Sequence, residues 1–224
     1  MSLAALFLAL SLPAAAETPV VALDPGHGGF DMGQSLNGVR EREFALAFAR
    51  LLEPRLKARG TMPFLTRFSD EFVALSSRVV SAEQVHSKVF LSIHLDNNAE
   101  RGGKGVMLWV YGKNNSIPQG PPRQHGERML PAPPKDQVAV SRRLAERIQI
   151  VLRKRGLRVA GYVDRGPFAV LKGPGMASVL IEVANLHDKA EARQVKDPAF
   201  QAKLADAVAD AVGLHLASEA RRGP

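Results

Sequence analysis

The stretch VVALDPGHGG, residues 20–29, decides the expected fold. Its first four residues are apolar, and an aspartate, a proline and glycines follow them, which is typical of a short strand that ends in a tight loop. Five further segments are short, apolar and bounded by turn-forming or polar residues. Strands are therefore also predicted at Met62–Thr66, Val89–Ile93, Val106–Val110, Ala169–Leu171 and Val179–Ile181.

Amphipathic helices are expected between these strands. Apolar residues recur with helical spacing along Arg42–Arg59, between Asp70 and Val85, along Val138–Arg155 and along Ala199–Leu216. Pro54 should kink or split the first of these helices, because it removes a backbone hydrogen bond. Asp70 is the expected N-cap of the second. Strands that alternate with helices predict an α/β layer fold with a mainly parallel sheet.

Length and composition set further bounds. The chain has 224 residues, a formal charge of +8, 46% apolar and 23% charged residues, which is ordinary for a globular domain and argues against disorder. The length suits one domain, or at most two small ones. No apolar run reaches the roughly 18 residues that span a bilayer. Because the chain has no cysteine, disulfides, thiolate nucleophiles and Cys-ligated metals are excluded.

The first 16 residues are predicted to be a signal peptide. Leu3–Leu12 is apolar, and Ala14-x-Ala16 has the small-residue pattern of a signal-peptidase site. No basic residue occurs before Arg40, so a start upstream of Met1, a weak signal, or an apolar first helix of the domain stay open. We expect a periplasmic or secreted bacterial protein without a membrane span after processing.

Polar side chains follow three of the predicted strands. His27 comes after the first strand, His94 after Val89–Ile93 and Glu182 after Val179–Ile181, while Glu41 and Glu43 open the first helix. Ligands of a parallel α/β sheet collect at the carboxyl ends of its strands. We therefore expect these side chains to lie close together at one edge of the sheet.

Two neutral imidazoles and one carboxylate are typical of an open zinc site that keeps a position for water. The histidines favour zinc over harder cations. Asp24 and Asp96 are placed to accept hydrogen bonds from the histidine rings, and a second glutamate would act as general base.

Structural interpretations stay open beside this one. Each histidine is alternatively a hydrogen-bonded residue at a strand end, and Glu41 and Glu43 a solvated first helical turn stabilised by the helix dipole. Gly26–Gly29 lacks the Lys-Ser/Thr and the spacing of known phosphate-binding loops. An isolated carboxylate at Glu182, within an apolar run, would be costly unless something compensates it.

Five motifs carry a resemblance to a known family. They are DPGHGGFD at 24–31, RERE at 40–43, LTR at 65–67, SIHLD at 92–96 and LIEV at 180–183. In this order and spacing they resemble the zinc-dependent N-acetylmuramoyl-L-alanine amidases of the bacterial cell-wall type that separate daughter cells, from about residue 20 to 216. The resemblance implies a twisted six-stranded sheet flanked by helices. It also implies hydrolysis of the peptidoglycan amide bond between the lactyl group of N-acetylmuramic acid and L-alanine.

The resemblance also implies roles for single residues. His27 matches the first zinc ligand, Glu41 the glutamate ligand and His94 the last ligand, while Glu182 matches the catalytic glutamate. Glu43 is a second-choice ligand. Arg67, together with Asp24 and Asp96, is expected to support the ligands or the substrate.

The resemblance assigns residues 17–218 to the catalytic domain and 219–224 to a short tail. The segment Ala184–Leu186 departs from the family's frequent Gly-Phe, which leaves the pocket shape open. Some relatives carry an inserted helix that plugs the zinc until a partner removes it. The corresponding region here, Gly112–Lys135, has six prolines, so we expect no self-inhibition of that kind. A protein activator stays open as a partner, and so do two rival functions, a zinc exopeptidase acting on free peptides and a non-catalytic wall-binding module.

Residues 123–158 hold ten Lys or Arg and three acidic residues. This segment is either a solvated helix face with its loop, or a surface that adheres to anionic peptidoglycan by an attraction that salt would weaken. Nucleic acid is not an expected partner, because aromatics are only 6% of the chain and none interleave with these arginines.

Overall fold

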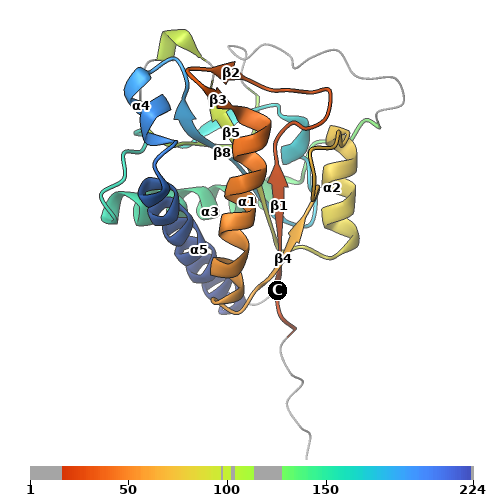
Figure 1. Ribbon diagram of the computed structural model, residues 1–224. Helices are drawn as coiled ribbons and strands as arrows, with labels where there is room; N and C mark the ends of the chain where they lie inside the picture. Colours follow the sequence, from red (N-terminus) through yellow and green to blue (C-terminus); the bar gives the residue numbers. More distant parts are fainter. Residues whose placement is uncertain (1–16, 97, 102–103, 114–127, 223–224) are drawn as a thin grey trace, which may run out of the picture.

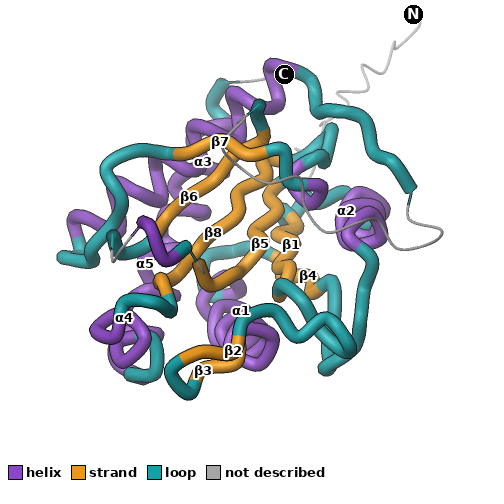
Figure 2. Tube along the Cα trace, turned by 90° about the horizontal axis from the view of Figure 1, so that it is seen from above, coloured by secondary structure: helices purple, strands orange, loops and turns teal. Residues whose placement is uncertain are grey.

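A six-stranded sheet forms the centre of the molecule. The computed structural model describes residues 17–96, 98–101, 104–113 and 128–222, so the predicted signal peptide lies outside the described residues. The strand order is β4-β1-β5-β8-β6-β7; Figure 1 labels the first four of these strands and Figure 2 labels all six. The first four of these strands are mutually parallel, β6 is antiparallel to β8, and β7 is parallel to β6. The strands are β1 (Val20–Pro25), β4 (Met62–Leu65), β5 (Val89–Asp96), β6 (Met107–Tyr111), β7 (Asp164–Gly166) and β8 (Ala177–Asn185).

Helices cover both faces of this sheet. α1 packs on β1 and β5, α3 packs on β8 and β6, and α5 packs against α1 and α3, so these three helices share one face. α2 lies on the other side of the sheet with the short helix η2 (Figure 2). The helices are α1 (Glu41–Lys57), α2 (Leu75–Gln84), α3 (Lys135–Lys154), α4 (Lys189–Gln194), α5 (Pro198–Ala220) and the 3₁₀ turns η1 (Ala99–Arg101) and η2 (Ala169–Leu171).

Each face of the sheet has its own apolar core. On the α1 side, Phe48 and Leu52 are fully buried against strand residues such as Leu91. On the α2 side, Val79 and Phe90 belong to a second cluster. Burial of a side chain of this size stabilises the fold by about 1.5–3 kcal/mol. The predicted single-domain α/β fold with a six-stranded, mostly parallel sheet flanked by helices is therefore confirmed.

The prediction for the sixth strand is wrong. Ala169–Leu171 forms η2, and its Val170 and Leu171 are buried against α2, while the sixth strand is β7 (Asp164–Gly166). A three-residue apolar run fits a helical turn as well as a strand, because its periodicity does not separate the two. The composition of β7, Asp-Arg-Gly, is unfavourable for a strand, which explains why it was missed.

Two predictions about helix α1 and helix α2 are also corrected. α1 runs without a break from Glu41 to Lys57, so Pro54 does not split it. This proline lies in the last turn, where the Arg55 and Arg59 guanidinium groups donate to the carbonyl oxygens of Leu51 and Arg55 at 2.7 and 2.8 Å. Asp70 is not the N-cap of α2, which begins after Ala74. Instead the Asp70 carboxylate accepts a hydrogen bond from the backbone N–H of Gly29 at 2.9 Å.

Besides β7, four elements have no counterpart in the prediction: β2 (Ser35–Leu36), β3 (Val39–Arg40), η1 and α4. The hairpin of β2 and β3 leads into α1, and α4 lies between β8 and α5. α5 continues to Ala220, two residues past the expected end of the domain. No helix in the described residues is long and apolar enough to cross a membrane. Most of the proline-rich region, residues 114–127, lies outside the described part of the chain, and so does the expectation about a plug.

The basic residues on α3 are in part neutralised. Arg142 pairs with Glu146 at 2.8 Å, Arg143 with Glu219 at 2.7 Å, and Arg155 with Asp210. The last two pairs connect α3 to α5. These contacts favour the interpretation of the basic segment as a solvated helix face.

Candidate metal centre

The loop after β1 places His27 in an unusual backbone conformation. Its φ angle is +60°, in the left-handed region that side chains other than glycine rarely adopt. Two buried arginines hold this loop by its carbonyl oxygens. Arg67 donates to Pro25 and Gly26, each at 2.9 Å, and Arg78 donates to Pro25 at 2.7 Å and to His27 at 2.8 Å. The loop is therefore fixed from within the fold, and the His27 ring is aimed by its backbone.

The glycine at position 26 is required by the close approach of His94. A Cβ atom built on Gly26 would lie 2.3–2.7 Å from three atoms of the His94 ring. Gly33, with φ of +59°, has a similar role, since its Cβ would lie 2.7 Å from both a Glu41 carboxylate oxygen and His27 Cδ2. The small residues of this region thus leave room for the imidazoles and the carboxylate to converge.

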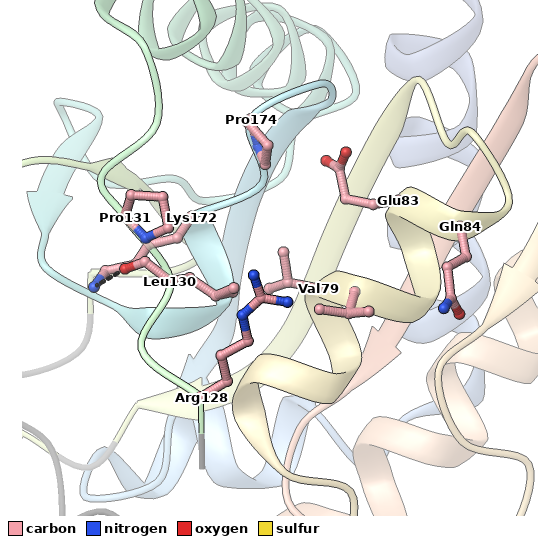
Figure 3. Close-up of a pocket in the computed structure, with 9 residues that line it drawn as sticks. Val79, Glu83, Gln84, Arg128, Leu130, Pro131, Lys172 and Pro174 are labelled. Carbon is pink, nitrogen blue, oxygen red and sulfur yellow. Dashed lines mark hydrogen bonds between the residues drawn. The ribbon is translucent and has the colours of Figure 1, made fainter.

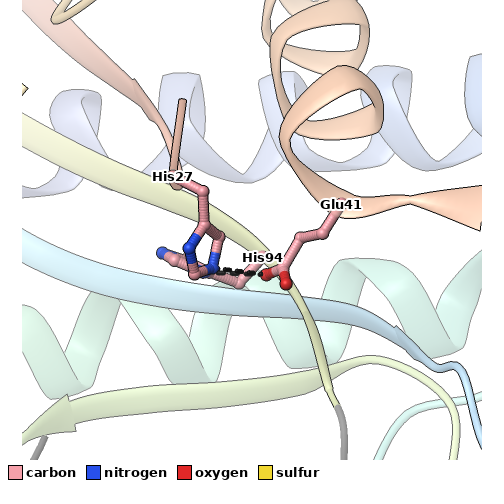
Figure 4. Close-up of side chains that lie close together, drawn as sticks. All are labelled: His27, Glu41 and His94. Carbon is pink, nitrogen blue, oxygen red and sulfur yellow. Dashed lines mark hydrogen bonds and ion pairs between the residues drawn. The ribbon is translucent and has the colours of Figure 1, made fainter. Parts of the chain in front are cut away.

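Glu41 is the first residue of α1, and its buried carboxylate points toward both histidines (Figure 4). Its Oε1 lies 3.0 Å from His27 Nε2 and 3.1 Å from His94 Nδ1, and it accepts the Leu95 N–H at 3.0 Å. Its Oε2 accepts the Gln34 N–H at 2.8 Å. These contacts hold a charged group in a buried position, which would otherwise be costly.

The three side chains offer one nitrogen or oxygen donor each, and these atoms lie within 4.8 Å of one another. The two rings are 5.0 Å apart between centroids and inclined at 79°, in an edge-to-face arrangement. This is the donor set that zinc prefers in an open protein site. The residues present therefore fit the metal that the sequence predicts.

Asp31 orients His27 from the other side of the ring. Its Oδ1 accepts a hydrogen bond from His27 Nδ1 at 2.8 Å, which leaves Nε2 to face Glu41. Burial lowers the pKa of His27, but the hydrogen bonds and charges of Asp31 and Glu41 outweigh burial and raise that pKa to about 10. Burial raises the pKa of Glu41, but both histidines outweigh it, so that the pKa lies well below its usual range. The same negative charge that favours a proton on His27 would favour a metal cation, so protons and metal compete for the site.

Glu182 lies on β8 directly beside His94. The two residues are paired in the register of β5 and β8, and Met107 of β6 is the partner of Glu182 on the other side. Neighbouring strands are about 4.8 Å apart, and paired residues point to the same face of a sheet. Glu182 is half-buried between the buried Ile181 and Val183, less enclosed than the apolar run suggested. The sheet thus brings this carboxylate next to the three predicted ligands.

The remaining predicted residues are not members of the His27–Glu41–His94 donor group. Glu43, the second-choice ligand, is exposed and pairs with Arg40 at 2.8 Å. Asp24 is fully buried and accepts from Thr66, Arg78 and Ser92 at 2.6–2.9 Å, so its bonds go to these partners and not to a histidine ring. Asp96 Oδ1 accepts the Asn98 N–H at 3.0 Å.

Arg67 holds backbone carbonyls and thereby shapes the loop of His27. Sequence reasoning missed Asp31 and Arg78. Asp31 follows His27 by four residues in the quoted motif, and this spacing across a tight glycine turn was a usable signal. Arg78 gave no local signal, because its contacts with Asp24 and His27 span more than 50 residues.

Two cavities lie elsewhere in the molecule. One of about 440 Å³ is bounded by α2 residues Val79 and Glu83 and by Leu130, Lys172 and Pro174 (Figure 3). Lys172 closes one side of it by donating to the Leu130 carbonyl at 3.0 Å. The other cavity, of about 600 Å³, lies between α3 and α5. Neither cavity is lined by His27, Glu41 or His94. We therefore assign the candidate site to the edge of the sheet.

An α/β domain with a His–Glu–His donor set and a separate carboxylate at its strand ends is typical of hydrolases that use a metal-bound water. Comparison with known proteins identifies the family within this class. The chain belongs to the Amidase_3 family, described as N-acetylmuramoyl-L-alanine amidase, which matches residues 21–213.

Individual relatives agree with this assignment. The amidase AmiC of Neisseria meningitidis is 30% identical over 219 residues, which cover 88% of this chain and 53% of AmiC. The amidase LytC of Bacillus subtilis is 32% identical over 207 residues, covering 90% of this chain and 36% of LytC. This chain therefore spans about half or less of the length of these relatives. The CwlD amidase of Clostridioides difficile, solved in complex with the GerS lipoprotein, shares the fold with a TM-score of 0.68 at 20% identity, over 90% of this chain and 100% of CwlD.

Proposed function

We propose that this protein is a peptidoglycan hydrolase that cleaves the amide bond between the lactyl group of N-acetylmuramic acid and L-alanine of the stem peptide. Membership of the amidase family supports this substrate. The observation that carries the proposal is the convergence of His27, Glu41 and His94 on one point at the carboxyl ends of the strands. This donor set supports zinc as the cofactor.

His27 Nε2, Glu41 and His94 would hold the zinc ion. When bound, zinc would supply a Lewis acid for the lactyl carbonyl and a water molecule whose pKa is lowered to about 7. Asp31 keeps the His27 ring in the orientation that presents Nε2, and Arg78 and Arg67 keep the loop carbonyls from rotating. These residues act by positioning, because a donor held in place loses no further freedom when it binds.

Glu182 is proposed as the general base and acid. Its place beside His94 supports this role, since the attacking water has to lie next to the metal ligands. Glu182 takes the proton of the water as it attacks the carbonyl carbon. It then returns the proton to the alanine nitrogen as the C–N bond breaks.

Digestion of purified sacculi, with and without a chelator, tests the proposed function. Mass analysis should find intact stem peptides with a new N-terminal alanine, and the chelator should abolish their release. Single amino acids would instead indicate an exopeptidase, and no released product would indicate a wall-binding module. Either of these two results would contradict the proposal.

Export and regulation belong to the same proposal. Peptidoglycan as substrate supports a periplasmic or secreted location and a role of the daughter-cell-separation type, with residues 17–218 as the catalytic domain. The complex of CwlD with GerS supports a protein activator as a partner. Adhesion of residues 123–158 to the anionic wall stays a prediction, which the ion pairs of α3 weaken.

A further inference from the structure

An exposed phenylalanine, Phe30, lies in the loop that carries His27, and it contacts half-buried Phe72 of the loop between β4 and α2. The Gly28 N–H donates to the Asp31 carbonyl at 2.8 Å, and the Asp31 N–H donates back to Gly28 at 3.2 Å, so Phe30 lies at the tip of a tight turn. Its ring stacks on Phe72, with centroids 4.1 Å apart and 24° between the planes. We call these two rings the Phe30–Phe72 platform.

Other apolar side chains of the same two loops are also exposed. Phe30 is 66% exposed, and the same two loops contribute Met32 at 56% and Phe68 at 62%. A single exposed apolar side chain needs no explanation. Three of them in two adjoining loops next to a candidate metal centre are typical of a surface that binds a ligand.

The platform is held rigidly. The loop of Gly28 and Gly29 lies so close to the second loop that a Cβ on Gly28 would be 2.2 Å from the Glu71 carbonyl oxygen, and one on Gly29 would be 2.7 Å from the Phe72 nitrogen. The Gly29 N–H donates to Asp70 at 2.9 Å. The exposure of Phe30 is thus a property of two loops fastened together.

The distance to the metal centre limits what the platform can bind. Phe30 follows His27 by three residues, so their Cα atoms are at most about 11 Å apart. The sugar that carries the scissile amide has to lie at the metal centre if the proposed function holds. The next part of the substrate along the glycan strand, or along the peptide, is then within reach of the platform.

The chemistry of the platform favours the glycan. The rings of Phe30 and Phe72 contain no hydrogen-bonding group. A peptide backbone laid on them would lose water from its N–H and C=O groups without replacement. A pyranose ring presents C–H groups on its face and hydroxyls at its rim, so its face covers an aromatic ring while its hydroxyls stay hydrated or bonded.

Polar groups lie in or directly beside the same two loops. Asp70 has its carboxylate 3.4 Å from the Arg42 guanidinium, and both are part of the two loops or directly beside them. Glu71 is exposed next to Phe72. These groups can accept from and donate to sugar hydroxyls at the edge of the aromatic surface.

We propose that the Phe30–Phe72 platform is a glycan subsite that stacks on a sugar ring of the peptidoglycan strand adjacent to the sugar that carries the scissile amide. This inference rests on the proposed function and specifies how that site takes a polymeric substrate. It adds a preference for long glycan strands over single muramyl peptides.

Binding of peptide-free glycan strands tests this subsite without any need for hydrolysis. Phe30→Leu keeps an apolar side chain but removes the aromatic face, and Leu214→Ala, at a 51% exposed position on α5, is a matched control. Calorimetric titration with a peptide-free tetrasaccharide should show about fivefold weaker binding for Phe30→Leu, as expected for one lost aromatic stack. The control should bind as the wild type does.

Kinetics separate the glycan from the peptide. Phe30→Leu should lower kcat/KM through KM on a tetrasaccharide substrate that carries stem peptides, and should leave hydrolysis of a single-sugar muramyl peptide unchanged. Equal losses on both substrates would place the stem peptide on the platform and overturn the inference, as would unchanged binding of the tetrasaccharide. Wild-type protein that binds glycan through Phe30 but releases no stem peptide would contradict the proposed function alone.

Discussion

His27 shows how much support one predicted ligand needs. Its left-handed backbone accepts a hydrogen bond from Arg78 at 2.8 Å, and its ring is held by Asp31 at 2.8 Å. Arg78 in turn forms a buried ion pair with Asp24 at 2.9 Å. Removal of one partner of such a pair costs about 3–5 kcal/mol, because it leaves a buried charge uncompensated. The sequence predicts His27 as a ligand, but the support from Arg78 comes from a residue 51 positions further along the chain.

The first prediction separates the proposed base from the proposed ligands. Glu182→Gln should retain zinc, since the residue lies beside the donor set and not in it, while hydrolysis of sacculi should fall by at least about 100-fold. His27→Ala and His94→Ala should lose the bound zinc in addition to the hydrolytic activity. Metal analysis of the purified variants and product release from sacculi check both statements. An active Glu182→Gln protein would show that another group moves the proton.

The second prediction concerns Asp31, which raises the pKa of His27 through a hydrogen bond and its charge. Asp31→Asn should move that pKa from about 10 down toward its usual range, because the carboxylate that stabilises the protonated ring is gone. NMR titration of the His27 ring in protein freed of metal measures this change. Zinc affinity should also fall about 10- to 100-fold. An unchanged His27 pKa together with an unchanged zinc affinity would mean that Asp31 does not orient this ring.

The third prediction uses the close approach of Gly26 to His94. Gly26→Ala places a Cβ within 2.3–2.7 Å of the ring, so the ring has to move and zinc affinity should fall. Gly161→Ala is the control, since nothing lies within 4 Å of its Cβ and its φ is not positive. Titration of both variants with zinc should separate them. Equal affinity would show that the ring adjusts without cost.

At the scale of elements, helices α1, α3 and α5 were predicted well, because their apolar residues repeat over several turns. Short elements were predicted poorly. The 3₁₀ turn at Ala169–Leu171 was taken for a strand, and the strand Asp164–Gly166 was missed. Three residues contain less than one turn of an α-helix and only one and a half periods of a strand, so packing decides them: η2 forms where Val170 and Leu171 reach the core beside α2.

Helix α5 carries a prediction about stability and pH. His215 is buried on this helix, and burial lowers its pKa to about 4. In the unfolded chain its pKa is about 6.5, so the unfolded state binds a proton first as the pH falls. This residue should therefore reduce the free energy of unfolding progressively between pH 6.5 and pH 4, by up to about 3 kcal/mol.

Urea denaturation at several pH values checks this statement. His215→Leu should lose that part of the pH dependence, whereas His86→Gln, at an exposed position after α2, should behave as the wild type does. An identical slope in wild type and His215→Leu would contradict the role given to burial.

At the scale of the whole molecule, the sheet is what makes a site out of separate motifs. The parallel neighbours β1, β5 and β8 end at the same edge, so residues 27, 94 and 182 meet although the chain separates them widely. Alternating strands and helices were enough to predict this edge. The bonds of Asp24 were not predictable in the same way, because its partners on β5 and α2 are known only once the helices are packed.

The central claim is that His27, Glu41 and His94 jointly bind one zinc ion. Anomalous diffraction from crystals grown with zinc tests it most directly. The account predicts a single strong peak between His27 Nε2, the Glu41 carboxylate and His94 Nδ1, at about 2.0–2.2 Å from each donor atom. A zinc peak bound by other side chains, with these three left unligated, would contradict it.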